Sequence, residues 1–477
     1  MNLEIPDSCP SIILGGGPAG LGIAHRLLSY GQKAFLLEKQ DRCGGLSKTD
    51  HYLGCKVDLG PHIFHTDKQH VIDLVAGLLN EDLVPRQIKV RVYSNGQFVP
   101  YPIKGMSVIT ALDSATAIHA VFDLLLARLG NMIHPASQVR SFEEWIIRQF
   151  GRTIYRCYFE SYAGKVWKLS PREISSYVAI KRVPVFSIMD YIRKHFHLKP
   201  RRYHSEDQDF VRVFYPRHGI GQLMDRMTEQ VIKNGGRIQT ESDVAEITLE
   251  GSKIVSILYK HGQEIRQLKT DFVFSTIPIT SLIACLRPAP PGAVLRAAAE
   301  LQYNAGRFLY VAVKKEYVFE AALTYFQNQD IEFNRVYSLR HLSVECVPSG
   351  QEVLCIEFTC KANDSLYRAS DEELFRHSMG VFEKLGILQK HEVAFYFSRK
   401  ADYAYPVFRV DYEKNLEIIF TYLQSIHNLM VLGRQGLFCY ANIDDVIAMG
   451  FRSVDLYHRG IEPPLNYSEL FKEYLHS

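Results

Sequence analysis

A glycine-rich turn near the N-terminus can bind phosphate. A short apolar run ends at Leu14, and Gly15, Gly17 and Gly20 follow it in a GxGxxG pattern that opens a helix-like segment. In this pattern the first glycine makes a tight turn, the second lets backbone amides approach a pyrophosphate, and the third lets helix pack on strand. Glu38 ends the next apolar run, where a carboxylate can accept from ribose hydroxyls. We therefore expect a dinucleotide at this turn.

The stretch VDLGPHIFHT places two histidines, His62 and His65, directly behind Gly60 and Pro61. Such a pair could ligate a metal, act as a general base, or form a wall of a cofactor site, because histidine titrates near neutral pH and also binds metals. Further His, Cys or carboxylate ligands with a recognised metal spacing do not accompany them. We expect no metal here.

Strands and helices that would position these residues recur along the chain. The chain is therefore predicted to leave the nucleotide domain and to re-enter it. An apolar run precedes Glu38, and further strands and helices of the same kind appear in the middle and near the C-terminus. The expected segments are a helix at Gln222–Lys233, strands at 237–240, 244–249 and 271–279, and a helix from Ile443 after a turn at Gly433 and Gly436.

Two insertions separate these segments. Residues from about 93 to 199 are mostly helical in pattern, with helices expected at 108–129, 142–150 and 153–163. Residues from about 307 to 400 alternate strands such as FLYVAVKK and VLCIEFTC with a helix at 371–385. The basic stretch RKHFHLKPRRYHSEDQ is expected to be a solvated loop or a lid over an anionic substrate.

Composition limits the class of protein. The 477 residues, 47% of them hydrophobic, can bury a large core, and 55 basic against 52 acidic side chains give no field that draws nucleic acid or a membrane. Nine cysteines without a CxxC pair favour reduced thiols in a cytoplasm. The N-terminus lacks a basic n-region, and the most apolar stretch, 117–129, is interrupted by charge. We expect neither a signal peptide nor a transmembrane segment.

A second glycine-rich turn, DRCGGLSKT, follows soon after Glu38 and contains Arg42, Gly45 and Ser47. In this arrangement the chain resembles the large FAD family that includes amine oxidases, protoporphyrinogen oxidase and UDP-galactopyranose mutase. The resemblance implies an α/β fold: a Rossmann-like, glutathione-reductase-like FAD-binding domain with an inserted helical domain and an inserted antiparallel-sheet substrate domain. The expected parts are 1–90, 206–305 and 411–477 for FAD, 91–205 for the helical insertion and 306–410 for the sheet.

Within that family, ordered motifs along most of the chain resemble UDP-galactopyranose mutases. They are GQFVPYPI, YFESYAGKVWKLSP, IKRVPV, EFNRVYS, YAYPVF and GRQGLFCYANIDD. The resemblance implies a substrate site formed by Tyr101, Ile103, Tyr162, Trp167, Arg182, Tyr191, Arg335, Tyr405, Tyr440 and Asn442. A nucleotide sugar needs such a set, because its base stacks on aromatic rings and its diphosphate pairs with guanidinium and phenol groups.

The same resemblance implies which residues contact FAD. They are Gly15, Gly17, Pro18, Ala19, Gly20, Glu38, Lys39, Arg42, Gly45, Leu46, Ser47, Gly60, Pro61, His62, Ile63, Val244, Gly433, Arg434, Tyr440, Asn442 and Ile443. On this interpretation His62 is part of a wall beside the flavin and acts with Arg182 and Arg335 in the reaction. His65 is expected to matter less, as a histidine packed in the turn.

The implied activity is interconversion of the pyranose and furanose forms of a UDP-sugar. In the mutases it proceeds through an adduct between the sugar and N5 of reduced FAD, so NAD(P)H would be needed only as reductant. The expected protein is cytoplasmic, belongs to cell-surface glycan biosynthesis, and is either a monomer or a homo-oligomer.

Two alternatives stay open. One is a true FAD-dependent oxidoreductase of the amine oxidase or protoporphyrinogen oxidase type. Amine oxidases generally carry a lysine near the flavin at the start of a strand in the second insertion, where this chain has Arg307. The other is a flavin-binding protein without catalysis of its own, which the arginines and tyrosines of the motifs make less favoured.

Overall fold

The computed structural model describes residues 8–64, 66–94, 96–101, 112–133, 139–183 and 210–460. The chain divides into two compact units, each assembled from segments far apart in the sequence. The first unit contains Met1–Val84, Phe214–Tyr303 and Tyr412–Ser477, and the second contains Pro85–Val213 and Asn304–Asp411. The helical and the sheet-forming insertions therefore belong to one unit.

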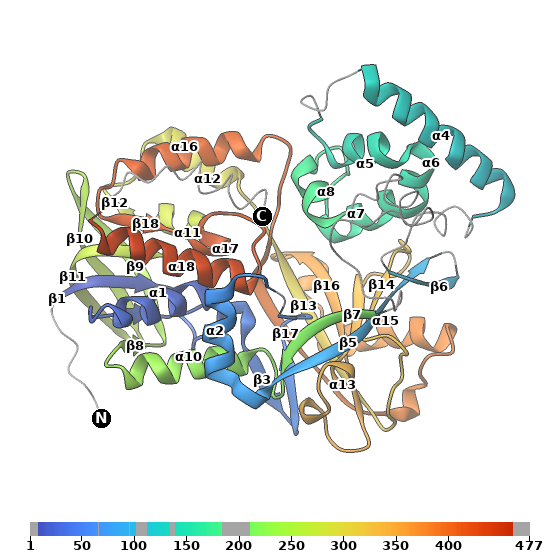
Figure 1. Cartoon of the computed structure of the whole chain (residues 1–477), viewed down its shortest axis with the longest axis horizontal. Coiled ribbons are helices and arrows are strands. Elements are labelled where there is room, and N and C mark those ends of the chain that lie inside the picture. Colours follow the sequence, from blue (N-terminus) through green and yellow to red (C-terminus); the bar gives the residue numbers. More distant parts are fainter. Residues whose placement is uncertain are drawn as a thin grey trace. The chain divides into compact units, whose positions relative to one another are not determined.

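The first unit is built on an eight-stranded sheet in the order β12-β9-β10-β11-β1-β2-β8, with β18 pairing to β11 (Figure 1). Its strands are β1 (Ser8–Leu14), β2 (Phe35–Leu37), β8 (Arg237–Gln239), β9 (Ser242–Glu250), β10 (Lys253–His261), β11 (Glu264–Ser275), β12 (Leu286–Arg287) and β18 (Leu429–Val431). The strands β8, β2, β1, β11 and β18 run parallel, and apolar residues such as Ile12 and Ile13 are fully buried between layers, as parallel sheets require.

Helices of the first unit surround this sheet. They are α1 (Pro18–Ser29), α2 (Gln69–Leu79), α10 (Gly221–Lys233), α11 (Ile279–Cys285), α12 (Gly292–Glu300), α16 (Tyr412–Gln424), α17 (Gly433–Gly436) and α18 (Ile443–His458). A short hairpin, β3 (Thr49–Tyr52) and β4 (Cys55–Asp58), precedes α2. Helices α1 and α18 pack closely because Gly450 of α18 has no side chain. A β-carbon there would lie only 2.9 Å from the carbonyl oxygen of Ala19 in α1.

The second unit contains another eight-stranded sheet, in the order β17-β13-β16-β15-β14-β5-β6, with β7 pairing to β5. Its strands are β5 (Leu83–Ser94), β6 (Gln97–Pro100), β7 (Phe210–Pro216), β13 (Tyr303–Val313), β14 (Leu323–Phe326), β15 (Arg335–Ser338), β16 (Glu352–Lys361) and β17 (Val393–Pro406). Helix α15 (Asp371–Lys384) packs its apolar side on this sheet, and the buried rings of Phe326, Phe333, Phe358 and Phe382 fill the core.

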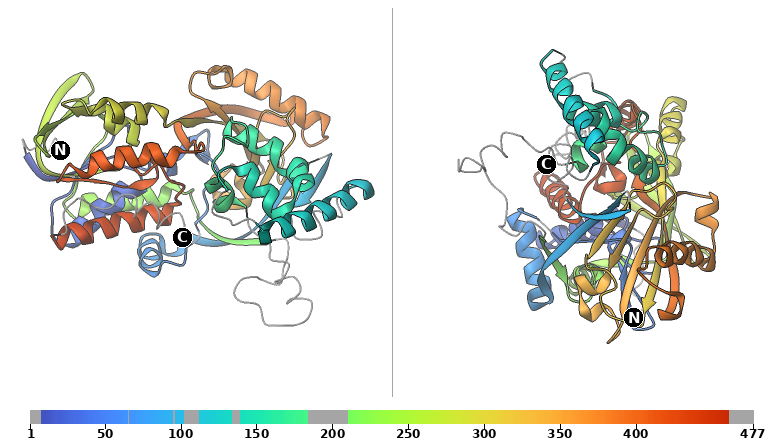
Figure 2. Two further views of the ribbon diagram at one scale, coloured as in Figure 1. Left: turned by 90° about the horizontal axis from the view of Figure 1, so that it is seen from above. Right: turned by 90° about the vertical axis from the view of Figure 1, so that its right-hand side faces the viewer.

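Apart from α15 and short helices such as α13 (Leu339–Leu342) and α14 (Ser365–Arg368), the helices of the second unit form a group of their own, drawn in teal (Figures 1 and 2). They are α4 (Ser114–Ile133), α5 (Phe142–Phe150), α6 (Arg152–Ile154), the π-helical turn η4 (Tyr155–Phe159), α7 (Glu160–Trp167) and α8 (Ser176–Arg182). The single helix expected at 153–163 is thus interrupted by a π turn. No helix among the described residues is long and apolar enough to cross a membrane.

Candidate functional site

The glycine turn between β1 and α1 has the backbone of a phosphate-binding loop. Gly15 has φ +98°, and its N–H donates to the carbonyl of Leu37 at 2.9 Å. A β-carbon at Gly20 would lie 1.9 Å from the carbonyl oxygen of Gly15, so only glycine permits this turn. A β-carbon at Gly17 would meet no atom within 4 Å. The space before the α1 N-terminus is therefore open at the position where an anion would approach.

Glu38 is held beside this turn. Its carboxylate accepts from the backbone N–H of Gly16 at 2.6 Å and of Gln40 at 2.8 Å, and the residue is 7% exposed. Burial, and next the charge of Glu38, raises the pKa of the nearby Cys43 thiol to about 12, so the thiol stays neutral. Two backbone N–H groups thus fix this carboxylate beside the glycine turn.

The second glycine turn lies against the first. The N–H of Gly44 donates to the carbonyl of Gly16 at 2.8 Å, and a β-carbon at Gly45 would lie 3.3 Å from the Cα of Gly17. Leu46 and Ser47 complete a 3₁₀ turn, η1, that begins at Gly45. Two glycine-rich turns therefore border the open space at the start of α1.

Three other residues predicted to contact FAD have partners within the first unit. Arg42 donates to the carboxylate of Asp50 and to the carbonyl of Thr49. Lys39 is exposed and pairs with Asp243 at 3.0 Å. Val244 lies on β9, and its carbonyl accepts from the Cys285 thiol.

The segment that carries His62 follows β4. Gly60 has φ +99°, which makes the turn before Pro61, and the Nε2–H of His62 donates to the carbonyl of Leu59 at 3.2 Å. This contact sets the tautomer of the neutral ring. Ile63 is 40% exposed, and His65 lies outside the described residues.

A turn near the C-terminus of the chain packs on helix α1. Gly433 has φ +84°, and a β-carbon there would approach that of Ala19, in the first turn of α1, at 3.1 Å. The guanidinium of Arg434 lies over the ring of Tyr440 at 4.5 Å. Asn442 caps α18 through reciprocal hydrogen bonds with Asp445, so Ile443 is the first residue of that helix.

Lys68 pairs with both acids at the N-terminus of α18 and balances one of their two negative charges. Its ammonium group pairs with Asp444 and with Asp445, each at 2.8 Å. The start of α18 is thereby tied to the segment that precedes α2.

In the second unit, two of the predicted site residues, Arg335 and Tyr405, form a hydrogen-bonded cluster with Glu357. Nε of Arg335 pairs with Glu357 at 2.7 Å, Nη2 donates to the phenol oxygen of Tyr405 at 3.1 Å, and this phenol donates to Glu357 at 2.7 Å. Burial acts to lower the pKa of Arg335, but Glu357, with Tyr405 and Tyr325, outweighs it and raises that pKa. The guanidinium is a permanent cation with one buried carboxylate partner.

Aromatic rings adjoin this cluster. Tyr325 on β14 is the register partner of Arg335, and its ring contacts Tyr101 at a centroid distance of 5.5 Å and Tyr162 at 6.0 Å. The sequence predicted Tyr101, Tyr162, Arg335 and Tyr405, and the structure brings all four together. Sequence reasoning missed Tyr325 and Glu357. A glutamate inside the apolar run VLCIEFTC is a signal that could have drawn attention to Glu357.

Among the described residues, Trp167 is a predicted substrate residue that lies outside this cluster. Trp167 is 6% exposed, its ring packs on Phe408 at 5.9 Å, and its carbonyl accepts from Asn304, so it belongs to the core of the second unit. Arg182 is the last residue of α8, and its side chain is not described. Ile103 and Tyr191 lie outside the described residues.

Arg307, at the place where amine oxidases generally carry a lysine, is buried at 1% exposure. Its guanidinium donates to the carbonyls of Tyr367 and Ala369 and to the side chains of Asp371 and Ser398. These contacts commit it to holding helix α15 and strand β17 together.

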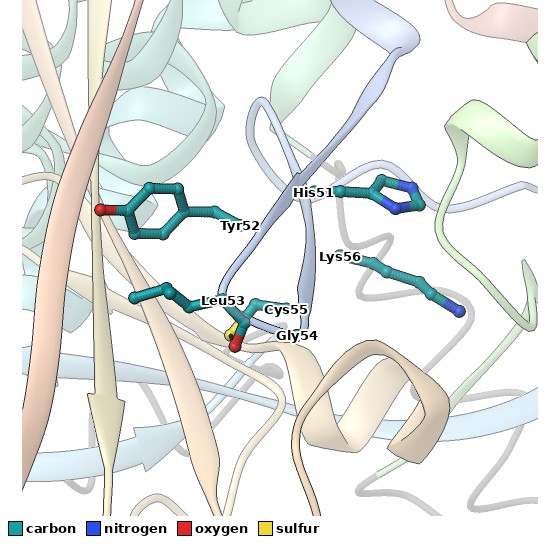
Figure 3. A pocket seen from close by; sticks show the side chains of 6 residues that line it. All are labelled: His51, Tyr52, Leu53, Gly54, Cys55 and Lys56. Atoms are coloured by element: carbon teal, nitrogen blue, oxygen red, sulfur yellow. Dashed lines mark hydrogen bonds between the residues drawn. The ribbon is translucent and has the colours of Figure 1, made fainter.

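A small surface pocket lies at the β3–β4 hairpin, lined by residues His51 to Lys56 (Figure 3). Tyr52 and Leu53 point to one side of the hairpin, and His51 and Lys56 to the other (Figure 3). The Lys56 ammonium contacts Nδ1 of His218 at 2.7 Å. None of the predicted site residues lines this pocket.

Comparison with known proteins gives the family. Residues 18–407 match the family model described as flavin containing amine oxidoreductase, so the chain belongs to that family. A segment is 29% identical over 179 residues to a probable UDP-galactopyranose mutase of Klebsiella pneumoniae, and covers 36% of this chain and 44% of that protein. A dTDP-fucopyranose mutase of Escherichia coli is 27% identical over 177 residues, with 36% and 45% covered.

A crystal structure of reduced UDP-galactopyranose mutase has the same fold. The TM-score is 0.80 at 22% identity, over 95% of this chain and 94% of that one. The predicted FAD-binding fold and the resemblance to these mutases are thereby confirmed. The chain is a flavoprotein, and the open glycine turn and Glu38 fit the ADP half of FAD.

Proposed function

We propose that this protein is a flavin-dependent mutase that interconverts the pyranose and furanose forms of a nucleotide-linked sugar. UDP-galactose is the first substrate to test, and the dTDP-sugar of the second relative is the next. The matched segments span less than half of each relative, so the activity is assigned here from the residues of the chain as well.

The observation that carries the proposal is the cluster of Arg335, Glu357 and Tyr405 beside the rings of Tyr101 and Tyr162. A nucleoside diphosphate sugar presents a flat base, two phosphate charges and a hydroxyl-rich ring. A guanidinium and a phenol hold phosphate oxygens, carboxylates accept from sugar hydroxyls, and tyrosine rings stack on bases.

We assign each residue a role in this reaction. Reduced FAD, when bound, supplies a nucleophilic nitrogen, and NAD(P)H would be its source of electrons. Arg335 holds the departing diphosphate, and the Tyr405 hydroxyl, which donates to Glu357 in the structure, turns to donate to the phosphate. Arg182 adds a second positive charge, Tyr440 and Asn442 contact substrate and cofactor, and His62 borders the flavin. We also assign the protein to the cytoplasm, where nucleotide sugars are made.

The test uses flavin-loaded protein reduced with dithionite. UDP-galactopyranose and UDP-galactofuranose, separated by anion exchange, should interconvert with reduced enzyme and stay unchanged with oxidised enzyme. Arg335→Ala should remove most of this activity. Arg340→Ala, which removes another arginine of the second unit paired with a carboxylate, Glu316, is the matched control and should retain it. Identical sugar profiles with and without reduced enzyme, for both nucleotides, would reject the proposal.

An oxidoreductase is the second candidate, because the matching family model is that of amine oxidoreductases. The buried hydrogen bonds of Arg307 weigh against an amine oxidase, since no free lysine amine occupies that position. Peroxide release with a polyamine, or oxidation of a porphyrinogen, would favour this candidate over the mutase.

A further inference from the structure

Lys165 lies in α7 with its ammonium group surrounded by backbone carbonyls. The residue is 9% exposed, and Nζ donates to the carbonyl oxygen of Phe326 and to those of Asn328 at 3.0 Å, Ile331 at 3.0 Å and Phe333 at 3.1 Å. These four acceptors are all uncharged carbonyl groups. Three N–H bonds are therefore shared among four oxygens of one chain segment.

That segment joins two parts of the substrate cluster. Residues 327–334 connect β14 to β15, and Tyr325 and Arg335 stand on either side of this loop. At its far end, the N–H of Asn334 donates to the carbonyl of Glu357 at 2.8 Å. The path of the loop therefore sets where Arg335 begins its strand.

Helix α7 contacts the same hairpin a second time. Tyr162 lies three residues before Lys165, on the same side of the helix, and its ring meets that of Tyr325 edge-on at 6.0 Å. The side chain of Gln327 in the loop also donates to the carbonyl of Tyr158, in the π turn η4 that precedes α7, at 2.9 Å.

We propose that Lys165 is a positioning residue of the substrate site, which clamps the loop 327–334 so that Tyr325 and Arg335 are held in place beside Tyr162. The assignment to a substrate site rests on the proposed function, whereas the clamp itself rests on the four hydrogen bonds. Lys165 acts through Arg335 and Tyr325 and does not itself touch substrate.

The charge of this clamp is sensitive to pH near neutrality. Burial, and next the nearby Lys168, lowers the pKa of Lys165 to about 7, and Asp330 in the loop opposes that shift. Above this pH the ammonium becomes an amine with one N–H fewer and no positive charge. The loop should therefore lose order as the pH rises through about 7.

Hydrogen exchange of loop 327–334 tests the clamp in the flavin-loaded protein. At about pH 6, Lys165→Met should speed exchange of this loop by about tenfold, after correction for intrinsic rates. Lys168→Met, which removes a neighbouring half-buried lysine that makes none of these carbonyl contacts, is the matched control and should leave the loop protected at this pH. In the wild type, raising the pH from about 6 to about 8.5 should lower the protection of this loop. This last arm needs no variant, so it holds even if Lys165→Met fails to fold.

Calorimetric binding of UDP-galactose tests the link to the site. Its diphosphate does not titrate in this pH range, so a change of affinity reports the protein. Lys165→Met should weaken binding by about tenfold at pH 6 and abolish the pH dependence expected in the wild type. Lys168→Met should keep the affinity at pH 6 and move the pH dependence to higher pH, because Lys168 lowers the pKa of Lys165.

The outcomes separate the two ideas. Equal loop exchange in the wild type and in Lys165→Met, or protection in the wild type that does not change with pH, would overturn the clamp. A loosened loop with unchanged UDP-galactose affinity would overturn its role in substrate positioning. Failure of the wild type to bind UDP- or dTDP-sugars would reject the proposed function and leave the exchange result to judge the clamp.

Discussion

Replacing Gly17 with alanine should separate cofactor binding from folding. Gly17 has φ −72° and ψ −178°, a conformation open to alanine, and its added β-carbon would meet no protein atom within 4 Å. The folded apoprotein should therefore be as stable as the wild type, or more stable by about 0.5 kcal/mol because the unfolded chain loses freedom. The same methyl group would fill the space in which the pyrophosphate of FAD approaches the N-terminus of α1.

The magnitude follows from the hydrogen bonds at stake. A backbone N–H bonded to a phosphate is a charge-assisted hydrogen bond worth about 1.5–3 kcal/mol. Loss of one such bond weakens FAD by about 10- to 150-fold. FAD affinity is measured by titrating apoprotein and following flavin fluorescence, and stability by thermal unfolding of the apoprotein.

Two other glycines give the controls. Gly77 lies inside α2, and a β-carbon there also meets nothing within 4 Å, so Gly77→Ala should raise stability by about 0.5–1 kcal/mol with unchanged FAD affinity. Gly20→Ala, by contrast, places a carbon 1.9 Å from a backbone oxygen and should prevent folding. Wild-type FAD affinity in Gly17→Ala would refute the assignment of this open space to the pyrophosphate.

Three further predictions concern charge and the flavin wall. Glu357→Gln should lower the free energy of unfolding, measured by urea titration, by about 3 kcal/mol, because Arg335, with its side chain 15% exposed, loses its carboxylate partner. Tyr405→Phe should lower it by about 1 kcal/mol. Equal losses in the two variants would contradict the ion pair. Burial raises the pKa of Asp58 from 3.8 to about 6, so the folded state keeps a proton that the unfolded chain has released. Stability should therefore fall by about 3 kcal/mol between roughly pH 4 and pH 6, and Asp58→Asn should flatten that fall. His62→Ala should slow flavin reduction or turnover, measured by stopped-flow absorbance, more than it reduces FAD content; a metal requirement would refute this role.

Much of the secondary structure follows from local signals. The helix expected at 142–150 is observed at Phe142–Phe150, because Ser141 and Glu144 form a capping box that fixes its start. The helix expected at 222–233 is α10, whose buried residues recur with helical period. The π turn that divides the helix expected at 153–163 has no such local signal, since all its residues are compatible with an ordinary helix.

The substrate cluster shows what a single sequence leaves out. Arg335 and Tyr405 were found because each stands in a recognisable motif. Tyr325 and Glu357 were missed because their place is defined by strand pairing: the register of β14, β15 and β16 aligns Tyr325 with Arg335 and Arg335 with Glu357. Cross-strand neighbours of this kind are separated by ten or more residues, and their register depends on the whole sheet.

The pairing of Arg335 with Glu357 limits what Arg335 can do alone. Its charge is already balanced by Glu357 at 2.7 Å, so the pair presents no net charge to a diphosphate. An anion that binds there gains the directed N–H groups of Arg335, and the O–H of Tyr405 once that hydroxyl turns away from Glu357, with little long-range attraction. Orientation of the diphosphate and attraction of it are therefore separate tasks, and the second requires another cation. Arg182 is the predicted residue of the second unit that would supply it. On that assignment, the pair of Arg335 and Glu357 orients the diphosphate, and Arg182 sets the affinity for it.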